Sequence, residues 1–262
     1  MPTFDTLLYE VRDGKAFVTL NRPDHHNSFD QQMQRELRNL WEEVKDDHGV
    51  RVVVLTGAGD RAFCTGLDRN MQPINVDNRE FWEREDPSLW ISPKTCRVWK
   101  PVVCAVNGMA CGGGFYLLAE ADIIIAAEHA TFFDPHVTYA MTAVLEPVML
   151  SKRMPFGEVM RMALLGNDER ISARRALEIG LVSEVVPGAD LAATAEWVAD
   201  RIAEKDPNAV QGTVRALWAS LEVNRAVLMD LGFPLAAASN MAAGNERGQP
   251  VASGARREWR LR

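Results

Sequence analysis

Three consecutive glycines, Gly112–Gly114, lie between a short apolar run and an apolar helical segment. The run, Val102–Val106, predicts a buried strand, and Asn107-Gly108 predicts the sharp turn that ends it. Backbone N–H groups at the start of a helix have no partner within the helix and lie at the positive end of its dipole. Such an N–H can hold an anionic oxygen, because glycine lets a ligand approach the backbone closely. Close packing of helix against strand would explain the same glycines without a ligand.

A second glycine turn follows another predicted strand. Arg51–Leu55 is rich in valine, and Thr56-Gly57-Ala58-Gly59-Asp60 after it predicts a loop. The loop leads into residues 61–68, whose sequence is Arg-Ala-Phe-Cys-Thr-Gly-Leu-Asp. The chain resembles the crotonase (enoyl-CoA hydratase/isomerase) superfamily over nearly its whole length, through both glycine turns and through Asn21-Arg22-Pro23, Asn27-Ser28-Phe29, Asp122-Ile123, Ile171-Ser172-Ala173 and Gly180-Leu181-Val182.

The resemblance implies an α/β fold, a crotonase-like spiral of repeated ββα units with a helical C-terminal region. It also implies an acyl-CoA thioester as substrate, with its carbonyl oxygen between the backbone N–H groups of Leu67 and Gly113. Removing a proton next to a thioester places negative charge on that oxygen, and each fixed donor stabilises it by about 3–4 kcal/mol. By the same resemblance, the substrate-binding positions are Arg22, Ala62, Cys64, Gly66, Asp68 and Gly112.

Arg22 is expected near the phosphates of coenzyme A, because a guanidinium suits phosphate. No cofactor is expected beyond the coenzyme A of the substrate itself, and no metal is expected.

The sequence departs from the family at its acid–base residues. Hydratases of this family carry one glutamate after the glycine turn and a second after a proline further along. Here those positions hold Tyr116 and His136. The two carboxylates position and deprotonate a water and return a proton, so their absence argues against ordinary hydration of crotonyl-CoA.

Three side chains remain as candidates for proton transfer at the site: His136, Glu146 and Tyr116. Histidine titrates near neutral pH, so His136 could be an acid or a base, or a core histidine bonded to a carbonyl. Glu146 lies in an apolar stretch, where it could face the acyl group or simply begin a helix. Tyr116 could donate a hydrogen bond, with packing as its alternative role.

Three functions are compatible with this pattern. The first is a crotonase-type enzyme that stabilises a thioester enolate and catalyses isomerisation, hydration of an unusual substrate, or hydrolysis. The second is a catalytically silent acyl-CoA-binding protein of the same fold. The third is a serine hydrolase on a related fold, which the absence of a Gly-x-Ser-x-Gly sequence disfavours. We favour the enzyme, because the chain keeps a histidine and an acid near the glycine turn.

The composition fits one enzyme-sized protein. The 262 residues carry a net charge of −7, which argues against a nucleic-acid partner. The four cysteines lack CxxC spacing and the first residues lack a signal-peptide pattern, so we expect a reduced, cytoplasmic protein. No membrane span is expected, because Pro101, Asn107 and several glycines interrupt the uncharged segment 101–119.

The remaining elements are predicted from periodicity and turn signals. A hairpin joins Leu7–Val11 to Lys15–Leu20, and a capping-box pattern at Ser28–Gln31 begins a helix. The apolar stripe of that helix is Met33, Leu37, Leu40, Trp41 and Val44. Further strands are predicted at Ile123–Ala126 and Leu181–Val186, and helices at Leu191–Lys205, Pro207–Leu221 and near Leu235–Ala243.

We expect a spiral core over residues 1–190 and a helical region over 191–262. In the family this C-terminal region covers the site and makes subunit contacts, so the resemblance implies a homotrimer or a dimer of trimers. The segment Met71–Lys100 carries Phe81, Trp82, Trp90 and Trp99. These aromatic side chains could line an acyl pocket or could anchor a surface loop.

Overall fold

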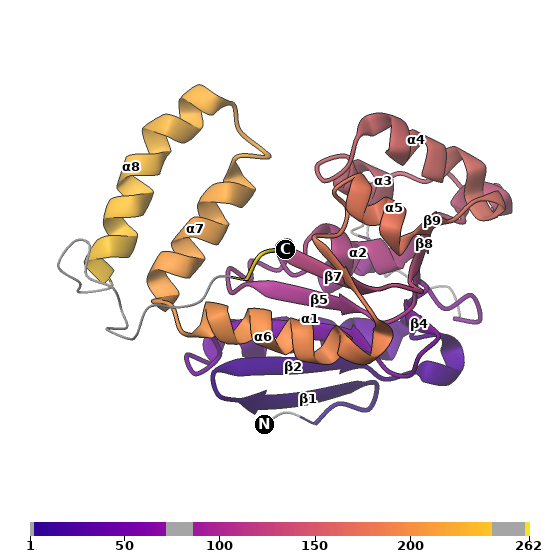
Figure 1. Cartoon of the computed structure of the whole chain (residues 1–262), viewed down its shortest axis with the longest axis horizontal. Helices are drawn as coiled ribbons and strands as arrows, with labels where there is room; N and C mark the ends of the chain where they lie inside the picture. The colour runs from indigo at the N-terminus through magenta and orange to yellow at the C-terminus, as the bar shows by residue number, and fades with distance from the viewer. Residues whose placement is uncertain (1–2, 72–85, 243–259) are drawn as a thin grey trace, which may run out of the picture.

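The computed structural model describes residues 3–71, 86–242 and 260–262, and their strands form two sheets (Figure 1). The larger sheet has the order β1 (Leu7–Arg12), β2 (Lys15–Leu20), β3 (Val52–Gly57), β5 (Val102–Val106), β7 (Ile123–Ala127) and β10 (Glu184–Val186). The smaller sheet has the order β4 (Ala62–Cys64), β6 (Met109–Cys111), β8 (Thr131–Phe133) and β9 (Ile171–Ser172). Only the pairs β1–β2 and β8–β9 are antiparallel among these strands.

The central strands of the larger sheet are buried on both faces. On β3, Val53 and Leu55 pack into a core with helix α1 (Gln31–Asp46), whereas Val52 and Val54 pack against helix α6 (Leu191–Ala203). Side chains alternate between the faces of a strand, so a strand covered on both sides must be apolar throughout. This is why the first four residues of β3, Val52–Leu55, are an unbroken run of valine and leucine.

Strands of the two sheets alternate along the chain. Each of β3, β5 and β7 in the larger sheet is followed by a short strand of the smaller sheet, β4, β6 or β8. After β6 and β8 the chain enters helices α2 (Phe115–Ala119) and α3 (Leu145–Leu150). The sequence interpretation missed β6, because a three-residue strand next to glycines has no periodicity to detect. The glycine turn therefore follows β6 and not β5 directly.

The N-terminal elements agree closely with expectation, apart from one cap. Asp13 and Gly14 have positive φ angles of 50° and 75°, which suit the tight turn between β1 and β2. The predicted apolar stripe of α1 is buried. The capping residue is Asp30, whose side chain accepts a hydrogen bond from the Met33 N–H at 2.9 Å, so the capping box predicted at Ser28 is wrong.

The remaining helices lie in the second half of the chain. They are α4 (Phe156–Leu165), α5 (Ala173–Glu178), α6, α7 (Pro207–Ala219) and α8 (Arg225–Ala242). Helix α6 lies along the larger sheet, and α7 and α8 run beside each other away from it (Figure 1). Helix α8 begins ten residues before the predicted start at Leu235, because Pro234 lies inside the helix and does not begin a new one. No described helix is long and apolar enough to cross a membrane.

Phe81 and Trp82, two of the four aromatic residues that could line an acyl pocket or anchor a surface loop, lie outside the described residues. The guanidinium of Arg38 lies 4.6 Å from the centre of the Trp90 ring, and the guanidinium of Arg215 lies 5.7 Å from the centre of the Trp99 ring. Both rings therefore stack with arginines of surface helices. This arrangement favours the anchoring role for these two tryptophans.

Candidate active site

The two glycine turns meet in the structure. Gly66 has a φ of +81°, and a Cβ built on it would lie only 2.6 Å from the backbone nitrogen of Gly113. A Cβ on Gly113 would lie 3.3 Å from Gly66 Cα and 2.5 Å from the ring of Phe29. Only glycine at both positions allows this approach. The peptides that carry the Leu67 and Gly113 N–H groups are therefore neighbours in space, although the residues are 46 positions apart.

Hydrogen bonds fix the direction of the Leu67 N–H. The Phe29 N–H donates to the Gly66 carbonyl at 2.8 Å, and the Asp68 N–H donates to the Phe29 carbonyl at 3.0 Å. In a trans peptide the C=O and the N–H point in opposite directions. Because the Gly66 carbonyl points toward Phe29, the Leu67 N–H of the same peptide points away from it. The hydrogen bonds with Phe29 therefore fix the direction of the Leu67 N–H, but this N–H is not a donor in either of them.

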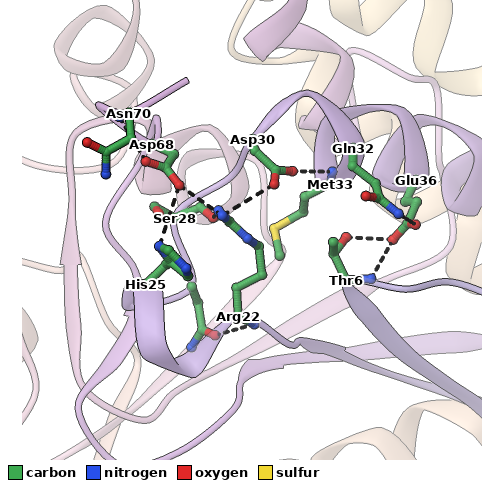
Figure 2. A network of polar contacts seen from close by, with 11 residues as sticks. Thr6, Arg22, His25, Ser28, Asp30, Gln32, Met33, Glu36, Asp68 and Asn70 are labelled. Carbon is green, nitrogen blue, oxygen red and sulfur yellow. Dashed lines mark hydrogen bonds and ion pairs between the residues drawn. The ribbon is translucent and has the colours of Figure 1, made fainter. Parts of the chain in front are cut away.

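An ion-pair network holds the residue after Leu67 (Figure 2). The Arg22 guanidinium donates to Asp68 Oδ2 at 2.8 Å, lies 3.3 Å from Asp30 Oδ2, and donates to the Ser28 carbonyl at 2.5 Å. His25 Nδ1 lies 3.7 Å from the same Asp68 oxygen. Arg22 is thus engaged within the protein, where it braces the turn that carries Leu67. Its contact with a phosphate stays a prediction.

The pKa of Asp68 lies below its ordinary value. Burial alone would raise it, but the Asn70 backbone N–H and the Arg22 guanidinium stabilise the carboxylate more strongly. The network therefore favours an ionised Asp68 next to Leu67.

Arg22→Met should lower the unfolding free energy at pH 7 by about 1–3 kcal/mol, because hydrogen bonds to a charged group are lost. The folded-state pKa of Asp68 is depressed, so this contribution is present above the unfolded pKa of aspartate and is lost as pH falls through the folded value. Urea unfolding of both proteins at pH 7 and at pH 3 measures the difference. Arg35→Met on the exposed face of α1 is the control, and an equal loss at both pH values would contradict the ion-pair role.

A polar cavity of about 590 Å³ reaches the glycine turns from the surface. Leu67, Asp68, Cys111 and Pro135 are among the residues that line it, and Arg69 and Arg170 supply positive charge. The Arg69 guanidinium lies 4.0 Å from the ring of Tyr139, and that of Arg170 lies 4.4 Å from the ring of Phe133. The sequence did not single out Arg69 and Arg170, because their positions in the chain give no sign that they line the same cavity. They could hold an anionic part of a ligand there.

Three other predicted binding residues shape the turns through their backbone. Ala62 accepts a hydrogen bond from Asn27 Nδ2 at 2.8 Å, and the Cys64 carbonyl would lie 2.5 Å from a Cβ on Gly114. Burial raises the pKa of Cys64 to about 12, so its thiol is not a nucleophile. A Cβ on Gly112 would lie 3.5 Å from Pro135 and 4.0 Å from His136 Cε1. Gly112 thus lies between the predicted anion-binding turn and His136, one of the predicted acid–base residues.

The structure brings the three predicted acid–base residues together. His136 Nε2 lies 3.7 Å from Glu146 Oε1, and the Tyr116 hydroxyl donates a hydrogen bond to Glu146. The side chains of His136 and Glu146 are 17% and 7% exposed, and Tyr116 is buried. They come from three separate segments: the 3₁₀ turn His136–Tyr139 after β8, helix α3 and helix α2. The three side chains meet on the side of the glycine turn where Gly112 lies. This arrangement favours a role in proton transfer over a role in packing alone.

A fourth residue, Asp134, belongs to the cluster and was missed. Its Oδ1 accepts a hydrogen bond from the His136 backbone N–H at 2.9 Å and lies within hydrogen-bond distance, 2.7 Å, of His136 Nδ1. The available signal was its position two residues before His136, which is the spacing of an Asx turn. That spacing alone does not show whether the carboxylate also reaches the imidazole ring.

The surroundings shift each pKa in a definite direction. The hydrogen bond to Asp134 raises the pKa of His136, against the opposing effect of burial. Burial raises the pKa of Glu146, and burial followed by the charge of Glu146 raises that of Tyr116. The pKa values of His136 and Glu146 are thus both raised, and Tyr116 stays protonated as a donor. His136 and Glu146 are the two groups of the cluster that could exchange a proton with a bound molecule. Among the described residues, no group of three or more His, Cys, Asp or Glu could hold a metal ion.

The chain is similar to known proteins in sequence and in fold. The chain is 39% identical over 208 residues to the (E)-benzylidenesuccinyl-CoA hydratase of Thauera aromatica, over 79% of this chain and 80% of that protein. It is 33% identical to the 1,2-epoxyphenylacetyl-CoA isomerase of Escherichia coli, over 83% of each. A crystal structure of an enoyl-CoA hydratase/isomerase from Mycobacterium paratuberculosis has a TM-score of 0.83 and 39% identity, covering 89% of this chain and 90% of that one. This match confirms the expected α/β fold. A model of the enoyl-CoA hydratase/isomerase family matches residues 10–231, and the chain belongs to that family.

Proposed function

We propose that this protein is an enzyme that transfers a proton on an acyl-CoA thioester through an enolate intermediate. The observation that carries the proposal is the convergence of Tyr116, His136 and Glu146 beside the turn where Gly66 and Gly113 touch. Family membership supplies the acyl-CoA class of substrate. A silent binding protein would need the glycine turns but would have no use for a buried pair with shifted pKa values.

In the proposed reaction the thioester oxygen accepts hydrogen bonds from the Leu67 and Gly113 N–H groups. The His136–Glu146 pair removes a proton from the acyl chain, and the electron pair of that C–H bond moves to the thioester oxygen as an enolate. The two N–H groups stabilise this charge more than the charge on the starting thioester. In an isomerisation the proton then returns to a different carbon. In a hydration the pair instead takes a proton from water as the water oxygen bonds to the β-carbon; the electron pair of the C=C bond moves to the thioester oxygen as the enolate, and the proton is then given to the α-carbon.

The acyl group is proposed to be bulky and to carry an aromatic ring. Two relatives at 39% and 33% identity are named for benzylidenesuccinyl-CoA, which carries an aromatic ring, and for 1,2-epoxyphenylacetyl-CoA, which carries the epoxide of such a ring. Tyr116 and His136 replace the two glutamates of ordinary hydratases, so crotonyl-CoA should be a poor substrate. The phosphates of coenzyme A would lie near Arg69 and Arg170 at the mouth of the polar cavity.

The subunits are proposed to form a homotrimer or a dimer of trimers. Helices α7 and α8 expose large apolar side chains, among them Leu217, Met229 and Phe233, which are 64%, 57% and 77% exposed. Contacts between subunits would bury such surface.

Calorimetry and turnover test the proposal together. We expect an aryl-substituted enoyl-CoA such as cinnamoyl-CoA to bind at micromolar to millimolar concentration, and the matching free acid to bind far more weakly. Loss of the enoyl absorbance, or product analysis by mass spectrometry, should show turnover of the aryl substrate and little of crotonyl-CoA. Binding of acyl-CoAs without turnover of any would favour the silent binding protein. Binding of the free acid alone would contradict the acyl-CoA assignment.

A further inference from the structure

Asp134 is completely buried and makes an unusual pair of contacts with one residue. Its Oδ1 accepts a hydrogen bond from the backbone N–H of His136 at 2.9 Å and lies 2.7 Å from the ring Nδ1 of the same residue. Its Oδ2 is also buried and has no hydrogen-bond partner among the described residues. A buried carboxylate with a free oxygen costs stability. Closing an Asx turn alone would need only the bond to the backbone N–H, so the contact with the ring calls for a further explanation.

We infer that Asp134 is a positioning residue that holds His136 in the Nδ1–H form and turns its Nε2 toward Glu146. The inference rests on the proposed function of this site. A carboxylate cannot donate a hydrogen bond when ionised, so the short contact requires a proton on Nδ1. With that proton fixed, neutral His136 has its free lone pair on Nε2, 3.7 Å from Glu146 Oε1.

This orientation determines where a proton can move. Nε2 can accept a proton from Glu146 or from a substrate that reaches this pair, and the Asp134 charge stabilises the imidazolium that forms. The opposite ring form, with its proton on Nε2, would leave Nδ1 and Asp134 as two acceptors 2.7 Å apart. Other titratable or charged groups around the cluster are Tyr116 on α2, Cys111 at the end of β6, Arg170 before β9, and Asp86, which raises the pKa of Tyr116.

Nitrogen-15 NMR of the histidine rings tests the inference without any substrate. The chain has five histidines, and the signal missing from His136→Gln identifies His136. In the wild-type protein above the titration midpoint, we expect the shifts of a protonated Nδ1 and an unprotonated Nε2. In Asp134→Asn we expect the midpoint to move to lower pH, because the carboxylate charge is lost. An Nε2–H form in the wild-type protein, or an unchanged ring form and midpoint in the variant, would overturn the inference.

Kinetics then separate positioning from a purely structural role. Asparagine keeps an oxygen that can accept from the His136 backbone N–H, so the turn should survive, which circular dichroism and thermal unfolding check. With an acyl-CoA that the wild-type protein turns over, Asp134→Asn should lower kcat by about 10²-fold with little change in KM. It should also shift the pH profile of kcat. A lower melting temperature with unchanged kcat and pH profile would mean that Asp134 only closes the turn. If no acyl-CoA turns over, the proposed function fails, but the NMR result still decides the role of Asp134.

Discussion

Replacing Glu146 with glutamine should lower kcat/KM on an active acyl-CoA by about 10²–10⁴-fold, with little change in acyl-CoA affinity. Glutamine has nearly the same shape and still accepts a hydrogen bond from Tyr116, but it cannot carry the transferred proton. Burial has raised the pKa of Glu146, so its carboxylate holds a proton more strongly than an exposed glutamate does. Steady-state kinetics and calorimetry on the same variant separate the loss of rate from any loss of binding.

His136→Gln and Tyr116→Phe complete this experiment. Because His136 Nε2 and Glu146 lie 3.7 Å apart, the wild-type pH profile should report ionisations of the pair and not of either residue alone. Glu146→Gln and His136→Gln should each remove one limb of the pH profile. The kcat/KM of the double variant should be only slightly lower than that of the less active single variant. Tyr116→Phe removes only the hydroxyl, so its rate should fall less than that of Glu146→Gln. Near-wild-type rates for both Glu146→Gln and His136→Gln would show that neither residue moves the proton.

The acid–base cluster shows what the sequence alone could and could not predict. His136 and Glu146 stood out as titratable residues near a glycine turn, and the structure places them together with Tyr116. The sequence did not single out Asp134. An aspartate that only closes an Asx turn and one that also contacts the imidazole ring two residues later have the same sequence pattern. The direction of a side chain depends on packing from other segments, which no single pattern contains.

Long elements were predicted more accurately than short ones. The hairpin of β1 and β2 and the stripe of α1 follow from periodicity, because each spans several repeats of its pattern. The strand β6 has three residues, and its place in the second sheet is fixed by pairing with β4 and β8. The role of Arg22 likewise depends on Asp68, 46 residues later, which the fold brings to it.

Gly66→Ala should lower kcat by about 10²–10³-fold, the effect expected when a donor to the enolate oxygen is displaced. The new methyl carbon would lie 2.6 Å from the Gly113 nitrogen, so one of the two turns must move. Both predicted N–H donors, of Leu67 and Gly113, belong to the peptides that would be pushed apart. The variant should also lose about 1–3 kcal/mol of unfolding free energy, because alanine is strained at a φ of +81°. Kinetics at saturating acyl-CoA and urea unfolding measure the two effects.

Two other glycines serve as matched controls. Gly180 has a φ of +80°, but a Cβ there would meet only the Arg153 carbonyl, at 3.8 Å. Gly180→Ala should therefore lose similar stability through backbone strain and keep its kcat. Gly157 in α4 has no atom within 4 Å of an added Cβ, so Gly157→Ala should keep both activity and stability or gain slightly in stability. A folded Gly66→Ala protein with the kcat of Gly180→Ala would contradict the role of the Leu67 and Gly113 N–H groups, because the enolate oxygen would then have to be stabilised elsewhere.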